Sequence, residues 1–139
     1  METLTITFDP AMRPDGRHAL CSDYVETFWL PRLGPSSIVL LRTLGRMYEP
    51  IATSGVTPHT YIPVAQLAHS LGLKGGISPN SRLGRTFARL EWYRIANITG
   101  PLALTVAPYL PTLTARHVAN LPQCLQAIHH ESAETAVHS

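Results

Sequence analysis

The chain has 139 residues, enough for one compact domain and too few for two. Charged residues make up 14% of it, whereas ordinary soluble domains contain about a quarter, so we expect an uncharged polar surface and a face covered by a partner. No apolar run approaches the ~18 residues of a membrane-spanning helix, and Met1 is followed by Glu2 instead of a basic leader, so we expect no membrane segment. Cys21 and Cys124 lie far apart, which favours reduced thiols in the cytoplasm over a disulfide framework.

The N-terminal part predicts a strand and then a helix. Apolar residues alternate with threonines over residues 3–8, which is the period of a half-buried strand. After a loop, Ser22 or Asp23 can cap a helix over residues 24–30 with an aromatic buried side. Pro31 and Gly34-Pro35 are expected to stop this helix.

The next segment predicts the central helix of the fold. Ser36 or Ser37 can cap a helix that ends at about Tyr48, where a Glu-Pro pair closes it. Apolar residues lie around most of its circumference, so we expect neighbours on several sides. A linker follows and leads to a short extended stretch at residues 60–62.

A pair of amphipathic helices is predicted next. Apolar residues at i, i+3, i+4 and i+7 indicate a helix over residues 64–71, and Gly72 ends it. After a glycine-rich turn, Ser78 or Asn80 can cap a second helix that runs to about Trp92.

The remainder predicts a hairpin and a last helical region. Two partly β-branched runs, residues 94–99 and 102–107, flank a Gly-Pro turn and indicate antiparallel strands. Thr112 or Thr114 can open the last helical region, which we expect to be bent or split at Pro122.

The net charge of +2 hides an uneven distribution. Residues 1–31 carry two arginines against five carboxylates, residues 32–94 carry eight basic residues against two carboxylates, and residues 95–139 carry one arginine against two glutamates. The middle of the chain is therefore strongly basic, which favours an anionic partner for one face.

The order of elements from residue 36 onward resembles a winged helix-turn-helix DNA-binding domain. The segment Val64–Leu73 is similar to the first helix of that motif, with a small alanine and a glycine at the turn. The turn up to Pro79 is longer than the minimal form. The resemblance implies a mainly helical α+β fold with a hairpin wing in one domain. It divides the chain into an N-terminal extension at 1–35, the winged core at 36–107 and a C-terminal helical extension at 108–139.

A second resemblance is carried by the stretch from Phe28 to Pro35, Phe-Trp-Leu-Pro-Arg-Leu-Gly-Pro, and the leucine-rich helix after it. It is similar to small uncharacterised proteins of actinobacteria and their phages. This likeness implies an origin and no particular target.

The second helix of the pair supports DNA binding independently of the resemblance. One of its faces is apolar, and a face roughly 130° away is cationic. The cationic face consists of Arg82, Arg85 and Arg89. Like charges at this spacing repel each other, so an anion would stabilise them. Arginine can bridge two acceptors of guanine in the major groove, and phosphates would also neutralise it.

Further contacts to DNA are expected from residues around this helix. They are Lys74 in the glycine-rich turn, Ser78, Asn80 and Ser81 near the helix start, and Arg94 at the base of the wing. The wing turn has no basic residue, so contacts through Asn97 or Thr99 are left open.

Several other interpretations compete with this one. The three arginines can instead cover apolar surface or pair with Glu91 and the acidic N-terminal segment. The winged domain can bind a protein, for instance as a phage-encoded inhibitor of a host protein. RNA binding would need aromatic residues on a sheet surface, which the sequence does not predict.

No enzyme, metal or cofactor site is expected. The histidines lack zinc-site spacing, including Cys124 with His129 and His130, and Cys21 with His18. Phosphate-loop and nucleophile-elbow motifs are absent, and carboxylates are few. The two extensions can form a homodimer seam or simply complete the core of a monomer, and the first option would let two copies read two half-sites.

Overall fold

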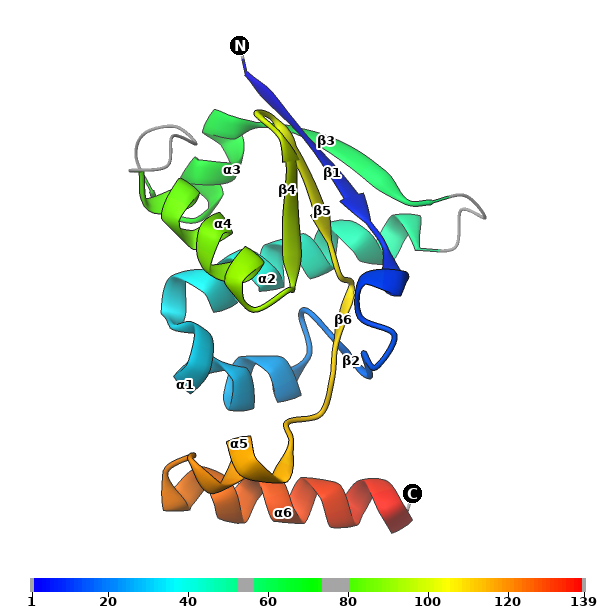
Figure 1. The fold of residues 1–139 in the computed structure, drawn as a ribbon, viewed down its shortest axis with the longest axis vertical. Coiled ribbons are helices and arrows are strands. Elements are labelled where there is room, and N and C mark those ends of the chain that lie inside the picture. The colour runs from blue at the N-terminus through cyan, green and yellow to red at the C-terminus, as the bar shows by residue number, and fades with distance from the viewer. Residues whose placement is uncertain (1, 53–56, 74–80, 139) are drawn as a thin grey trace.

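The computed structural model describes residues 2–52, 57–73 and 81–138, and it shows an α+β fold (Figure 1). Helices pack on one face of a small sheet, and a short second sheet lies below it. The C-terminal helices α5 and α6 lie at the end of the molecule opposite the N-terminus. Within the part of the chain that the structure describes, no helix combines the length and apolar character needed to cross a bilayer.

The first strand lies in the middle of the main sheet. β1 (Thr3–Phe8) pairs antiparallel with β3 (His59–Pro63) and parallel with β5 (Ala103–Val106), and β4 (Ala96–Gly100) follows at the edge. The predicted strand is confirmed, and its apolar positions are at most 1% exposed. A segment from the N-terminal extension thus separates β3 from the β4–β5 hairpin.

The first helix continues through the proline that was expected to stop it. A π-helical turn, η2 (Val25–Trp29), runs directly into α1 (Leu30–Leu33), which contains Pro31. The expected stop at Pro31 was wrong, because a proline in the first turn of α1 removes no hydrogen bond that this turn requires. The expected stop at Gly34-Pro35 is confirmed, because α1 ends at Leu33 with Gly34 as its C-cap. Ser22 caps the start, where its hydroxyl accepts from the N–H of Val25 at 3.3 Å.

The central helix, α2 (Pro35–Tyr48), is confirmed, but its cap is not the predicted serine. Gly34 is the N-cap, at φ +87°, and Pro35 occupies the first helical position. A glycine adopts this backbone conformation without the strain of a side chain, and proline has the φ that a helix start needs. Buried residues occur on several sides of α2. A short 3-10 turn, η3 (Glu49–Ile51), ends it.

The predicted helix pair is present as α3 (Val64–Ser70) and α4 (Arg82–Trp92). Gly72, at φ +70°, ends α3, and the N–H of Leu73 donates to the carbonyl of Ala68 at 2.8 Å. The expected caps of α4 were wrong, because the side chain of Ser81 accepts from the N–H of Gly84 at 3.0 Å.

The hairpin of β4 and β5 is confirmed, with a shift of register between Ile98 and Gly100. The segment expected to be a loop contains a 3-10 turn, η1 (Pro10–Met12), and β2 (His18–Ala19), which pairs with β6 (Tyr109–Leu110). Thr114 caps α5 (Ala115–Ala119), and α6 (Gln123–His138) follows Pro122, so the predicted split is confirmed.

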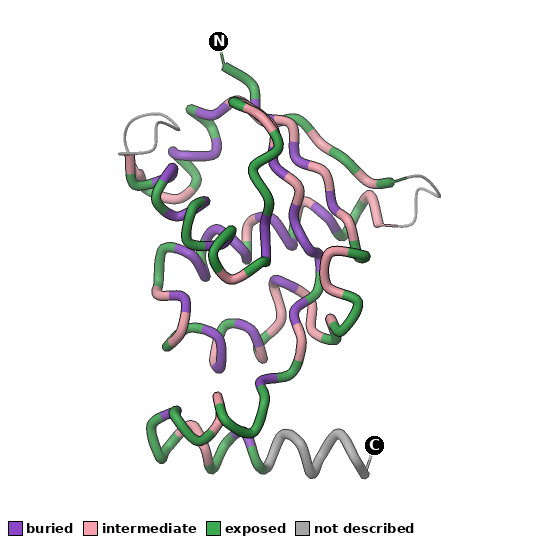
Figure 2. The backbone as a smooth tube through the Cα atoms, in the orientation of Figure 1, coloured by how far each residue is buried: buried purple, intermediate pink, exposed green. Residues whose placement is uncertain are grey.

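The N-terminal aromatic residues belong to the core, and Figure 2 shows buried stretches of backbone in the segment of η2 and α1. Phe28 and Trp29 are each 3% exposed, and Tyr24 is partly buried against the core. These aromatic side chains are therefore not exposed for a homodimer seam. In this part of the chain the N-terminal extension completes the core of the monomer. The predicted homodimer has to use other residues.

Candidate nucleic-acid interface

Helix α4 separates its apolar residues from its arginines. Leu83, Phe87 and Leu90 are at most 2% exposed and pack into the core. Arg82, Arg85 and Arg89 are exposed. The helical projection predicted this arrangement, and it puts three permanent positive charges on one surface.

The arginine surface borders a pocket. Arg82, Arg85, Thr86 and Arg89 form one wall, and residues 33–37, at the corner between α1 and α2, form the other. The pocket has a volume of about 470 Å³. The hydroxyl of Thr86 donates to the carbonyl of Arg82 at 2.8 Å, so it is satisfied within α4. We call this site, lined by α4 and residues 33–37, the arginine pocket.

The arginines of the pocket have no carboxylate partner among the described side chains. The ion pairs found among the described side chains join other residues, Arg13 to Asp15 at 3.7 Å and Arg42 to Glu26 at 3.1 Å. Glu91 was the alternative partner considered from the sequence. Its Oε2 instead accepts from the N–H of Ile98 at 2.8 Å, which connects the end of α4 to the wing.

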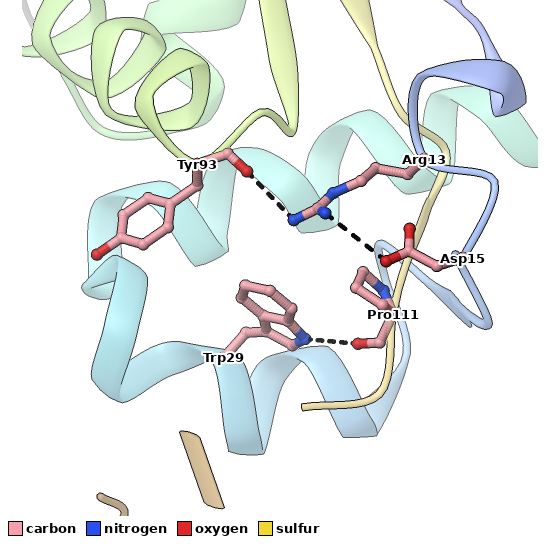
Figure 3. Close-up of polar contacts among 5 residues, drawn as sticks. All are labelled: Arg13, Asp15, Trp29, Tyr93 and Pro111. Atoms are coloured by element: carbon pink, nitrogen blue, oxygen red, sulfur yellow. Dashed lines mark hydrogen bonds and ion pairs between the residues drawn. The ribbon is translucent and has the colours of Figure 1, made fainter. Parts of the chain in front are cut away.

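The C-terminal end of α4 is anchored to the N-terminal segment (Figure 3). Arg13 Nη2 donates to the carbonyl of Tyr93 at 3.2 Å, and the indole N–H of Trp29 donates to the carbonyl of Pro111 at 3.2 Å. The hydroxyl of Tyr93 donates to the carbonyl of Arg32 at 3.1 Å. The guanidinium of Arg32 lies over the rings of Trp29 and Tyr93, at 5.8 and 5.5 Å from their centroids. The two walls of the arginine pocket are therefore held in fixed positions.

Of the other predicted contacts, the two that the structure describes, Ser81 and Arg94, do not line this pocket. Ser81 caps α4, so its hydroxyl already has a structural role. Arg94 is exposed directly after α4 and adopts φ +59°, which is unusual for a residue with a side chain. Lys74, Ser78 and Asn80 lie outside the described residues.

Sequence reasoning missed Trp92 as part of this surface. Its side chain is 81% exposed, the largest value among the exposed large hydrophobic residues. Its position continues the spacing of the three arginines by another three residues, so it lies near their stripe on the helix. That spacing was the signal that could have identified it. On the wing, Asn97 and Thr99 are exposed, and contact through them stays a prediction.

Three of the residues considered for a metal site, His18, Cys21 and His129, have other partners. His18 stacks on Tyr24 at 3.7 Å between centroids, and His129 Nε2 lies 2.7 Å from the hydroxyl of Tyr24. The thiol of Cys21 donates to Glu49 Oε1 at 3.2 Å, and burial raises its pKa, helped by this hydrogen bond. Among the described residues, no three histidines, cysteines or carboxylates come together as metal ligands.

Comparisons with family models, curated proteins and solved structures find no match. A function is therefore inferred from the residues of the chain itself. The arrangement with the clearest chemistry is the arginine pocket, which can hold a negatively charged group.

Proposed function

We propose that the chain is a cytoplasmic regulator of transcription that binds double-stranded DNA in a sequence-specific manner. In this proposal α3 and α4 are a helix-turn-helix, α4 enters the major groove, and the β4–β5 hairpin is the wing. The supporting observation is the surface of α4, where Arg82, Arg85 and Arg89 are exposed without a carboxylate partner among the described side chains.

The physics of this surface favours a polyanion. Guanidiniums at i, i+3 and i+7 repel one another, and an isolated monovalent ion neutralises only one of them. A duplex carries one negative charge per ~1.7 Å of its axis. The 11 residues of α4 span ~16 Å at 1.5 Å per residue, and the major groove is wide enough for a helix. Several arginines can therefore contact phosphates and guanine edges at once.

The test is binding to DNA as a function of salt. Duplexes are selected from a random pool and compared with the region upstream of the gene. We expect the affinity to fall steeply with salt, and the slope of log K against log salt to decrease by about one for each of Arg82→Ala, Arg85→Ala and Arg89→Ala. Arg116→Ala, an exposed arginine on α5, is the matched control. Wild-type binding by a folded triple variant would overturn the proposal.

A protein partner is the second candidate, and the exposed Trp92 favours it. Tryptophan and arginine are the residue types that contribute most binding energy at protein interfaces. In that case Trp92→Ala would abolish the interaction, and the salt dependence would be weak. Absence of binding to any duplex at low salt, with recovery of a partner that the Trp92 variant loses, would support this candidate.

The homodimer stays part of the proposal. Ile128 on α6 is 46% exposed and could contribute to a seam. Sedimentation of the free protein and of its DNA complex would show one or two copies per site.

A further inference from the structure

The wall of the arginine pocket opposite α4 is the N-terminal end of α2. This end has no side-chain cap and no acidic residue in its first turn. Pro35 has no N–H, and the bond from Ile38 N to the carbonyl of Gly34, at 3.2 Å, begins the helical pattern. The N–H groups of Ser36 and Ser37 precede it and have no acceptor within the helix. This end also carries the positive pole of the 14-residue helix.

Ser37 provides a second and independent observation. Ser37 is one of the residues that line the pocket, and it is only 2% exposed. No hydrogen bond joins its hydroxyl to a described residue, and the hydroxyl oxygen is not among the fully buried unpaired atoms, so it keeps a little accessible surface. An acceptor inside the pocket would satisfy this hydroxyl and the two backbone N–H groups.

The pocket therefore combines three kinds of donor: a helix N-terminus, a buried hydroxyl and the guanidiniums of Arg82, Arg85 and Arg89. All of them favour an anion with several oxygens, and the two walls are already held together by the hydrogen bond from Tyr93 to Arg32. We infer that the pocket is a phosphate-binding site that takes one phosphate of the DNA backbone. The identification of DNA as the source of the phosphate rests on the proposed function. The phosphate site itself does not.

The site is tested first without DNA. Inorganic phosphate is titrated into the full chain, and the amide signals of Ser36 and Ser37 are followed by NMR. We expect both signals to shift with saturation at millimolar phosphate, and no comparable shift at the N-terminus of α5. Ser36→Asp supplies a carboxylate to the same N–H groups, so it should raise Tm and abolish the response to phosphate.

Whether the phosphate in the pocket comes from DNA is tested with the selected duplex. Ser37→Ala removes an unpaired hydroxyl, so it should fold with an unchanged or higher Tm. We expect it to lose roughly tenfold in affinity for all duplexes, with an unchanged salt slope because no charge is removed. Thr43→Ala is the control, because Thr43 lies further along α2 and its hydroxyl is already bonded to the carbonyl of Val39.

The outcomes separate the two proposals. DNA binding by the wild type, without amide shifts in phosphate and with wild-type affinity in Ser37→Ala, would overturn the inference and leave the proposed function standing. Amide shifts in phosphate without DNA binding at low salt would overturn the proposed function and the DNA source, while the phosphate site itself would stand. Both effects together support both proposals.

Discussion

The hydroxyl of Tyr24 and Nε2 of His129 lie 2.7 Å apart and connect the first helical segment to the last. The same hydroxyl accepts from the N–H of Leu113 at 2.9 Å, which leaves its own hydrogen available for the imidazole. The neutral imidazole with an unprotonated Nε2 can accept this hydrogen. His18 stacks on the other side of Tyr24 and bonds to the hydroxyl of Thr112 at 2.8 Å.

This cluster predicts a loss of stability in acid. Burial lowers the pKa of His129 below its ordinary value of 6.5. Burial, followed by the nearby His129, lowers the pKa of His18 in the same way. The unfolded chain therefore takes up protons first, so the stability that these two histidines contribute is present above pH 6.5 and is lost as the pH falls through 6.5 toward their lowered pKa values. Urea denaturation between about pH 7.5 and pH 5 measures this.

His129→Gln should reduce the pH dependence, because the amide does not titrate. His69→Gln is the control, since His69 is exposed on α3. A stability that is constant down to pH 5, or an equal change in both variants, would contradict the proposed role of His129.

Removing the hydroxyl of Tyr24 should destabilise the fold. Tyr24→Phe leaves the N–H of Leu113, a residue only 6% exposed, without its acceptor, and Nε2 of His129 without its partner. We expect a cost of about 1–3 kcal/mol in the free energy of unfolding. Tyr61→Phe, at a position 63% exposed, should change it by less than about 0.5 kcal/mol. Equal effects of the two variants in urea would exclude the hydrogen bonds as the cause.

Local patterns predicted most elements, whereas long-range pairings were not predictable. The alternation in residues 3–8 identified a strand, but its parallel partner β5 lies about a hundred residues further along the chain, and no local pattern contains that information. The two-residue strands β2 and β6 are also too short to show a period. The caps were missed where a backbone conformation replaced a side chain, as at Gly34 before α2.

For the candidate site, the arginines were predictable and the pocket was not. Helical spacing places Arg82, Arg85 and Arg89 on one face from the sequence alone. Their position opposite Ser37 depends on the packing of α4 against the corner between α1 and α2, and only the tertiary structure shows it.

We expect that Gly45 does not tolerate substitution by a residue with a side chain, although it lies within helix α2. Alanine normally stabilises such a position by about 0.5–1 kcal/mol. Here a Cβ atom would lie 2.8 Å from the backbone nitrogen of Cys21 and 3.1 Å from the Cβ atoms of Cys21 and Leu20. Gly45→Ala should therefore destabilise by about 1–3 kcal/mol. Gly100→Ala is the control, because the nearest atom to an added Cβ is 3.6 Å away and the substitution should be tolerated. A Gly45→Ala protein that is more stable than the wild type would contradict the close packing of Gly45 against Leu20 and Cys21.

Arg94 gives opposite predictions for stability and DNA binding. It follows the C-terminal end of α4 at φ +59°, where its N–H donates to the carbonyl of Glu91 at 3.0 Å and the N–H of Ile95 donates to that of Leu90 at 2.9 Å. Glycine is the preferred residue at this position of the helix end. Arg94→Gly should therefore raise the free energy of unfolding by about 1 kcal/mol, because the strain of the side chain is removed.

If Arg94 contacts a phosphate as proposed, the more stable Arg94→Gly protein should bind DNA more weakly, with a salt slope lower by about one. Arg94→Lys keeps the charge and the strain, so it should resemble the wild type in both measurements. A stabilised Arg94→Gly protein with wild-type affinity would remove Arg94 from the interface, and the unusual backbone would then have no functional explanation. A destabilised one would contradict the helix end itself, because glycine can adopt φ +59° without strain.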